Sequence, residues 1–169
     1  QVEGRLTVPL YLDSDQPGAR LRWDPRGFPL GDGRVEVPFL LLIPHSAAQS
    51  AAAGGSPPLV QYGHGFFSGR TELLDPTFRR FAQRSGSVLA AVDWWGMSQA
   101  DLLPVMSTLA RDPDATYTFV ERTHQGFANA LALAEALYGP LKTEPACQIE
   151  GRLAYDPRPE SLRFYGTSE

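Results

Sequence analysis

From Pro58 onward, apolar runs of strand length alternate with segments of helical spacing. Residues 59–62, Val88–Val92 and 162–165 have the length and apolar character of strands, and Val88–Val92 is apolar throughout, as expected of a strand that is covered on both faces. Between them we expect helices from Pro76 to about Gly86, over residues 102–109 and over residues 116–138. This alternation predicts an α/β fold with a mostly parallel sheet and flanking helices.

The first part of the chain has a different pattern. Leu6, Val8, Leu10 and Leu12 alternate with other residues, which is the period of a half-buried strand. Residues 35–43 form a second apolar stretch, in which Pro38 indicates an edge strand or a bulge. The Ala/Ser/Gly-rich residues 45–58 are typical of a flexible connection. We therefore divide the chain into N-terminal strands with a connection, 1–57, and an α/β core, 58–169.

Composition excludes some classes of protein. Of 169 residues, 43% are hydrophobic and 20% charged, which is ordinary for a globular domain. The net charge of −4 argues against a general nucleic-acid binder, and no apolar run approaches the roughly 18 residues of a membrane span. Cys147 is the single cysteine, so no disulfide forms within the chain. The first residue is Gln1 and not methionine, which removal of a signal peptide or other processing would explain.

A glycine-rich loop, residues 63–69 (G-H-G-F-F-S-G), follows the first of these strands. Its free backbone N–H groups are suited to an oxyanion that develops during acyl transfer. An ordinary turn is the simplest alternative. A dinucleotide-binding loop is disfavoured, because such a loop opens directly into a helix, whereas the helix expected here begins only at Pro76.

Residues 93–98 (D-W-W-G-M-S) follow the next strand. Adjacent Trp94 and Trp95 either line an apolar acyl pocket or cap the core. We expect Asp93 to stabilise the turn by accepting backbone N–H bonds.

The third loop is G-T-S-E, residues 166–169, directly after the strand at 162–165. A strand that ends in a sharp turn with a serine is the layout of a nucleophile elbow. A serine hydroxyl needs a hydrogen-bonded base to react at neutral pH. We expect His64 to order its loop, His124 to be a packed, hydrogen-bonded helix residue, and His45 to be exposed.

Together these motifs resemble α/β-hydrolase lipases and esterases. Residues 62–66 (Y-G-H-G-F) are similar to the oxyanion segment of that superfamily, and residues 93–98 to the D-x-x-G-x-S stretch that follows its next strand. The set, with Q-G-F-A-N at residues 125–129, also resembles a group of large bacterial, exported hydrolases. Their usual elbow is G-N-S-Q-G-G, so T-S-E here puts an acidic side chain beside the serine.

The resemblance implies an α/β-hydrolase-type sheet, of which this chain is the N-terminal half preceded by extra strands, and ester hydrolysis through an acyl-enzyme. The implied site residues are Ser168 as nucleophile, the backbone N–H groups of Phe66 and Glu169 as oxyanion donors, Gly63, His64 and Gly65 as support for the oxyanion loop, and Phe67, Trp94 and Trp95 as the substrate pocket. In that superfamily the acid and then the histidine follow the serine, so both are expected from a downstream half. No cofactor is needed, and no residue cluster has metal-ligand spacing.

Several expectations about partners follow. The substrate is a small-molecule or lipid-like ester, and the other partner is the downstream half of the fold, as a second chain or a further segment. Since the strand at 162–165 would expose an unpaired edge, we expect the chain to be unstable alone. The resemblance implies a secreted or periplasmic protein. The alternatives are a non-catalytic hydrolase-like binding protein and a nucleotide-dependent oxidoreductase, which is the less favoured of the two.

Overall fold

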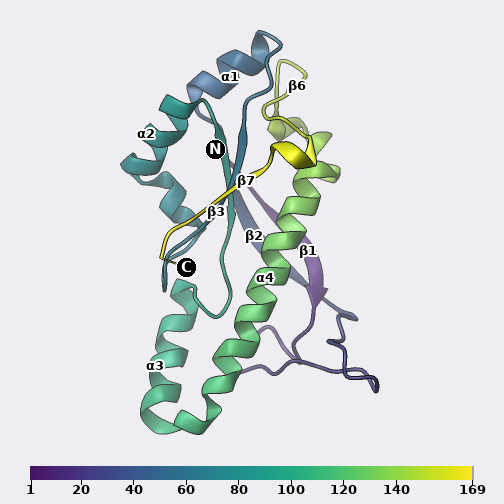
Figure 1. The fold of residues 1–169 in the computed structure, drawn as a ribbon, viewed down its shortest axis with the longest axis vertical. Helices are drawn as coiled ribbons and strands as arrows, with labels where there is room; N and C mark the ends of the chain where they lie inside the picture. The colour runs from purple at the N-terminus through teal and green to yellow at the C-terminus, as the bar shows by residue number, and fades with distance from the viewer. Residues whose placement is uncertain (169) are drawn as a thin grey trace.

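A mixed five-stranded sheet with the strand order β1-β2-β4-β3-β7 organises the computed structural model, which describes residues 1–168 (Figure 1). The strands of this sheet are β1 (Val2–Leu10), β2 (Gly33–Leu42), β3 (Leu59–Gly63), β4 (Val88–Val92) and β7 (Arg163–Gly166). The helices are α1 (His45–Ala52), α2 (Pro76–Ser85), α3 (Leu102–Arg111) and α4 (Tyr117–Tyr138). Two short strands, β5 (Gln148–Ile149) and β6 (Arg152–Leu153), form a separate hairpin. The chain also has 3₁₀ turns, which are η1 (Arg70–Leu74), η2 (Gln99–Asp101), η3 (Pro113–Thr116), η4 (Pro140–Lys142), η5 (Pro145–Cys147) and η6 (Pro159–Ser161).

The prediction of a mostly parallel, α/β-hydrolase-type sheet is wrong. Strand β2 pairs antiparallel with both β1 and β4, and only the β4–β3 and β3–β7 pairs are parallel. The alternation of strands and helices indicates parallel pairing only for strands that helices connect. In this chain those strands are β3, β4 and β7. The two N-terminal strands are joined by residues 11–32 without a helix, so they form an antiparallel pair. Through the β2–β4 pair, segments 1–57 and 58–168 share one sheet.

Helices cover the two faces of this sheet. On one face, Leu133 and Leu137 of α4 pack with Leu41, Ala90 and neighbouring residues in one buried cluster. On the other face, Leu73 of η1 and Ala82 of α2 pack with buried residues of β2, β3 and β4. In Figure 1, α4 runs beside the sheet, while α2 lies across the sheet from it. Both faces of β3 and β4 are therefore buried, which explains the continuous apolar character of β4.

Two expectations for the N-terminal part are wrong. Pro38 lies in an inner strand without a bulge, because the pairing of β1 with β2 is continuous. A proline is tolerated there since β4 pairs only with Phe39–Leu42, so Pro38 has no partner on that side. The supposed flexible connection contains helix α1, whose Ala47 and Ala51 are fully buried.

The predicted helices and strands of the core are confirmed. Helix α2 begins with Pro76 and ends at Gly86, which has a left-handed φ of 65°. Helical spacing in the sequence predicts one apolar face of α4 with Val120, Phe127, Leu131 and Leu137. Leu137 is buried as expected, but Val120, Phe127 and Leu131 are exposed, so most of that face is wrong. Helix α4 instead buries the polar side chains of Arg122, Gln125 and Asn129. Arg122 bonds to Asp101, Gln125 bonds to Pro9 and Tyr11, and Asn129 accepts a hydrogen bond from Gln125 within the helix.

Cys147 has no exposed surface and lies in the core beneath α1 and α4. Burial, with a smaller contribution from the nearby Glu144 carboxylate, raises the pKa of its thiol. Because the thiolate is the reactive form, we expect Cys147 to resist a thiol reagent such as dithionitrobenzoate in the native protein and to react fully after unfolding in urea. Stoichiometric reaction before unfolding would contradict the buried position.

No helix within residues 1–168 is long and apolar enough to cross a membrane.

Candidate functional site

Three loops meet at one edge of the sheet. They follow β3, β4 and β7, and because these strands are parallel, their carboxyl ends lie at the same edge. The Phe67 N–H donates to the Met97 carbonyl at 2.7 Å, and the Thr167 N–H donates to the Gly63 carbonyl at 3.1 Å. The glycine-rich loop therefore contacts both the D-W-W-G-M-S loop and the start of the G-T-S-E segment.

Ser168 lies in the turn that follows β7. Its φ is 63°, in the left-handed region that residues other than glycine rarely adopt. The residue is exposed at the strand end. Gly65 faces it closely, since a Cβ on Gly65 would lie 3.4 Å from the Thr167 carbonyl oxygen and 3.9 Å from Ser168 Cβ. A strained turn that presents a serine after a strand is one part of the geometry of a nucleophile elbow. Glu169, the other predicted elbow residue, lies outside the described residues.

His64 is buried and joins two of the loops. Its Nε2 accepts the Trp94 N–H at 2.7 Å, and its Nδ1 lies 2.9 Å from the Gly65 carbonyl. Nε2 must therefore be unprotonated, and Nδ1 carries the proton that it donates to Gly65. Both ring nitrogens are engaged in holding the loop, so neither is available to take a proton from Ser168.

This arrangement predicts a structural effect of His64. His64→Ala would leave the Trp94 N–H without its acceptor and create a cavity, so we expect the free energy of unfolding to fall by about 2–3 kcal/mol. His124→Ala is the matched control. His124 is hydrogen-bonded as predicted, with its Nδ1 2.8 Å from the Val120 carbonyl oxygen, but it is exposed and not packed. Its loss should therefore cost less than about 0.5 kcal/mol. Urea denaturation of both variants measures the difference, and equal losses would contradict the role of His64.

The two phenylalanines of the glycine-rich loop have different environments. Phe67 has a left-handed φ of 58°, and its N–H is used in the bond to Met97. Within residues 1–168, no acceptor for the Phe66 N–H is present. The Phe66 ring is half-exposed and packs against Phe67 and Phe119, with centroid distances of 4.5 and 5.9 Å. An unpaired N–H beside Gly65 and Ser168 is suited to bind an oxyanion.

Asp93 accepts a backbone N–H bond as predicted, but from η1 and not from its own turn, whose Gly96 and Ser98 N–H groups bond to Asp101. Asp93 Oδ1 accepts the Arg70 N–H at 2.8 Å, and its Oδ2 forms an ion pair with the Arg70 guanidinium. These contacts attach η1 to the end of β4. Residues Ser68, Gly69, Arg70, Asp93, Ser98 and Gln99 line an open polar depression of about 400 Å³ at this edge.

The two tryptophans, which the sequence assigned to a substrate pocket, are packed against other parts of the chain. Trp94 is buried and contacts Phe127 and Phe164 edge-on, with centroid distances of 5.0 and 6.1 Å. Trp95 is partly buried and lies under the guanidinium of Arg122, whose Cζ is 4.3 Å from the ring centroid. Their contact with a substrate stays a prediction.

The sequence reasoning missed Asp101, which is buried beneath the same loop. Its Oδ2 accepts the N–H groups of Gly96 and Ser98 at 2.9 and 3.1 Å and the Ser98 hydroxyl at 2.5 Å. Its Oδ1 pairs with Arg122 Nε at 2.6 Å, an ion pair with almost no exposed surface. The signal was present, since Ser98-x-x-Asp101 has the spacing of a helix-capping box, with Asp101 in the place of the usual glutamate.

The Q-G-x-x-N segment of α4 connects the helix to its neighbours. Gln125 accepts the Tyr11 N–H at 2.9 Å and donates to the Pro9 carbonyl at 3.0 Å. Gly126 is needed for space, because a Cβ there would lie 2.3 Å from Trp94 Cδ1. The segment thus allows the loop after β4 to pack directly on α4.

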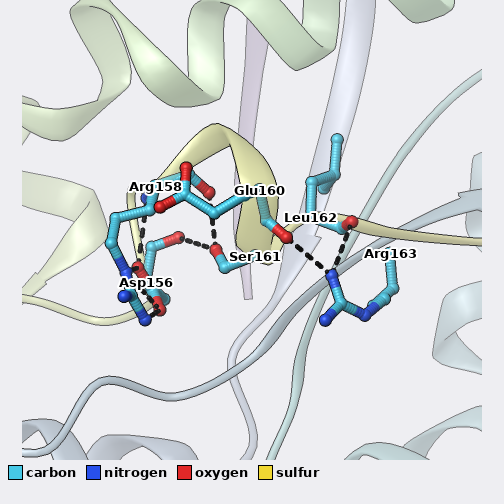
Figure 2. A network of polar contacts seen from close by, with 6 residues as sticks. All are labelled: Asp156, Arg158, Glu160, Ser161, Leu162 and Arg163. Carbon is cyan, nitrogen blue, oxygen red and sulfur yellow. Dashed lines mark hydrogen bonds and ion pairs between the residues drawn. The ribbon is translucent and has the colours of Figure 1, made fainter.

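A polar network fixes the entry to β7 (Figure 2). Arg158 donates to both carboxylate oxygens of Asp156, and this contact lowers the pKa of Asp156. The Asp156 N–H donates to the Pro57 carbonyl at 2.8 Å, next to the start of β3. Arg163 donates back to the carbonyls of Glu160 and Leu162. These contacts place β7 beside β3, and therefore place Ser168 beside the glycine-rich loop.

Within residues 1–168, no group of three or more His, Cys, Asp or Glu side chains is placed to hold a metal ion. Comparison with known proteins finds no family model, curated protein or solved structure that matches this chain.

Proposed function

We propose that the chain carries the nucleophile of a serine hydrolase that cleaves carboxylic esters. The observation that carries this proposal is the backbone of Ser168, held at a φ of 63° directly after β7 and facing Gly65. Strain of this kind in a non-glycine residue is typical of functional turns. The resemblance of the three loops to the motifs of lipases and esterases supports the same chemistry.

In the proposed reaction, Ser168 Oγ attacks the ester carbonyl carbon. The carbonyl oxygen becomes an oxyanion, which the N–H groups of Phe66 and Glu169 would stabilise. The bond to the alcohol oxygen then breaks, and the alcohol leaves with the proton taken from Ser168 by a base. Water, deprotonated by the same base, releases the acid from the acyl-enzyme and restores the serine.

The base and its acid partner are proposed to come from outside residues 1–168, because both nitrogens of His64 are engaged. The edge strand β7 supports this proposal. It pairs on one side only, with β3, and its aromatic residues Phe164 and Tyr165 are 56% and 50% exposed on opposite faces. A further strand with covering helices would bury both side chains and bring new residues to the serine edge.

A non-catalytic, hydrolase-like binding protein is the second candidate, and the engaged His64 favours it. The two candidates differ in one respect: the enzyme has a general base hydrogen-bonded to Ser168, and the binding protein has none. For the oxidoreductase alternative, the path of the glycine-rich loop is unfavourable, because the loop leads into the 3₁₀ turn η1 instead of a phosphate-binding helix.

Labelling of the full-length protein with a fluorophosphonate probe tests the proposal. The probe reacts with serines that a base activates, so peptide mapping should find one adduct, on Ser168, that heat denaturation abolishes. Intact, folded protein that gains no adduct would refute the enzyme and favour the binding protein.

A further inference from the structure

Thr167, the residue before the proposed nucleophile, is bonded through its side chain to the protein interior. Its Oγ1 lies 3.1 Å from the hydroxyl of Tyr62, and the same hydroxyl is hydrogen-bonded to the carboxylate of Glu72. A phenol has one proton, and the carboxylate can only accept, so Tyr62 donates to Glu72 and accepts from Thr167. The three side chains form one directed chain from η1 through β3 to the turn after β7.

The inner end of this chain is firmly held. The Tyr62 side chain is buried, and its ring packs against Phe78 at a centroid distance of 4.5 Å. Glu72 precedes Leu73, which has no exposed surface. Burial, reinforced by the bond to Glu72, raises the pKa of Tyr62, so its hydroxyl keeps its proton across the range in which esters are enzymatically hydrolysed.

The outer end needs support. All four residues of β7 are exposed, and the strand pairs only with β3. In the turn after β7, the backbone hydrogen bond within residues 1–168 is the one from the Thr167 N–H to the Gly63 carbonyl. The turn must nevertheless keep Ser168 in its unfavourable left-handed conformation. A side-chain bond from Thr167 to a buried, immobile hydroxyl supplies a second attachment one residue away.

We infer that Thr167, Tyr62 and Glu72 are positioning residues that hold the elbow so that Ser168 Oγ is aimed at the oxyanion loop. This inference rests on the proposed serine hydrolase for its catalytic consequence, while the attachment itself does not depend on the chemistry. It assigns a role to the residue between glycine and serine in the G-x-S motif, which in this chain is Thr167 and acts through its side-chain hydroxyl. It also assigns a role to the tyrosine of Y-G-H-G that is separate from substrate binding.

The test compares Thr167→Val, which removes the hydroxyl at nearly constant volume, with Thr167→Ser, which keeps it. In the full-length protein we expect Thr167→Val and Tyr62→Phe to lower kcat for a p-nitrophenyl ester by about ten- to a hundredfold, with KM changed less than about twofold, because the nucleophile is misplaced while the pocket is intact. Thr167→Ser should stay within about threefold of the unaltered protein. Tyr165→Phe is the matched control, since it removes the hydroxyl of a half-exposed tyrosine in β7 and should not change kcat.

Amide hydrogen exchange gives a readout that needs no activity. Peptides covering residues 163–168 should exchange at least about tenfold faster in Thr167→Val than in Thr167→Ser, while peptides from α4 remain unchanged. Equal exchange and equal kcat in the Val and Ser variants would overturn the inference, and so would a Tyr165→Phe effect as large as that of Tyr62→Phe. If the unaltered protein neither hydrolyses esters nor reacts with fluorophosphonate, the proposed function fails, and the exchange experiment alone then decides whether the attachment exists. Thr167→Val keeps the test valid should Tyr62→Phe fail to fold.

Discussion

Ser168→Ala is expected to lower kcat for ester hydrolysis by about 10⁴- to 10⁶-fold in the full-length protein, the range seen when the nucleophile of a serine triad is removed. The hydroxyl is the group that forms the acyl-enzyme, so no neighbouring residue within 1–168 replaces it in the proposed reaction. The loss of fluorophosphonate labelling should be complete. Steady-state hydrolysis of a p-nitrophenyl ester and mass spectrometry of the labelled protein measure the two effects.

The same substitution should leave the fold intact, because Ser168 is exposed at the end of an edge strand. Alanine experiences the same left-handed strain as serine, so we expect the melting temperature to change by less than about 2 °C. Ser168→Gly is the informative companion. Glycine adopts a φ near 63° without strain, so it should stabilise the protein by up to about 1 kcal/mol while it abolishes activity. A Ser168→Ala protein that still hydrolyses the ester at more than a few per cent of the original rate would place the nucleophile elsewhere.

The sequence predicted the position of most elements, but not the direction of every strand. The spacing of apolar residues and the residues that end helices are local features of the sequence. Each of the segments β3, β4 and α2 could therefore be recognised from its own residues. The antiparallel placement of β2 beside β4 depends on contacts between residues about fifty apart, such as Phe39 with Val92, for which a single sequence has no local signal. The alternation of strands and helices in the sequence therefore could not predict that the sheet is mixed.

The candidate site was predictable to a similar degree. The three loops could be found because glycines and a serine follow apolar strand-like runs. The side chains that hold the loops could not, since Tyr62, Glu72 and Thr167 meet only after β3, η1 and β7 are assembled. The face of α4 was misjudged for a related reason. Arg122 and Gln125 are buried because they find hydrogen-bond partners outside the helix, and helical periodicity alone places such residues in solvent.

These contacts change the interpretation of two motifs that support the resemblance. The D-W-W-G-M-S loop packs on the Q-G-x-x-N helix segment through Trp94 on Gly126, and the ion pair of Asp101 with Arg122 joins residues that flank the two motifs. The loop in turn holds His64, which orders the glycine-rich loop. Both motifs therefore help to fix the position of the glycine-rich loop, and this role does not require Trp94 or Trp95 to contact a ligand.

Asp101→Ala is the strongest test of that network, and we expect it to lower the free energy of unfolding by about 3–5 kcal/mol. The change would leave the Arg122 guanidinium buried without its carboxylate, and it would remove the acceptor of the Gly96 and Ser98 N–H groups. Since domains of this kind are stable by about 5–15 kcal/mol, the loss is a large fraction of the total. Urea denaturation followed by tryptophan fluorescence measures it, and Asp101→Asn, which keeps one carbonyl acceptor, should lose less.

Asp93→Ala is the matched control for this prediction, because Asp93 also pairs with an arginine at the end of β4. Its pair with Arg70 is more open, with side chains 25% and 23% exposed, whereas those of Asp101 and Arg122 are 1% and 7% exposed. Water can therefore solvate Arg70 once its partner is lost, and we expect a cost of about 1 kcal/mol. Equal losses for the two variants would mean that burial of the Asp101–Arg122 pair is not what stabilises the loop. A larger loss for Asp101, accompanied by faster amide exchange in both the 63–69 and 93–98 loops, would show that this buried carboxylate holds the oxyanion loop in place through the loop that carries Trp94.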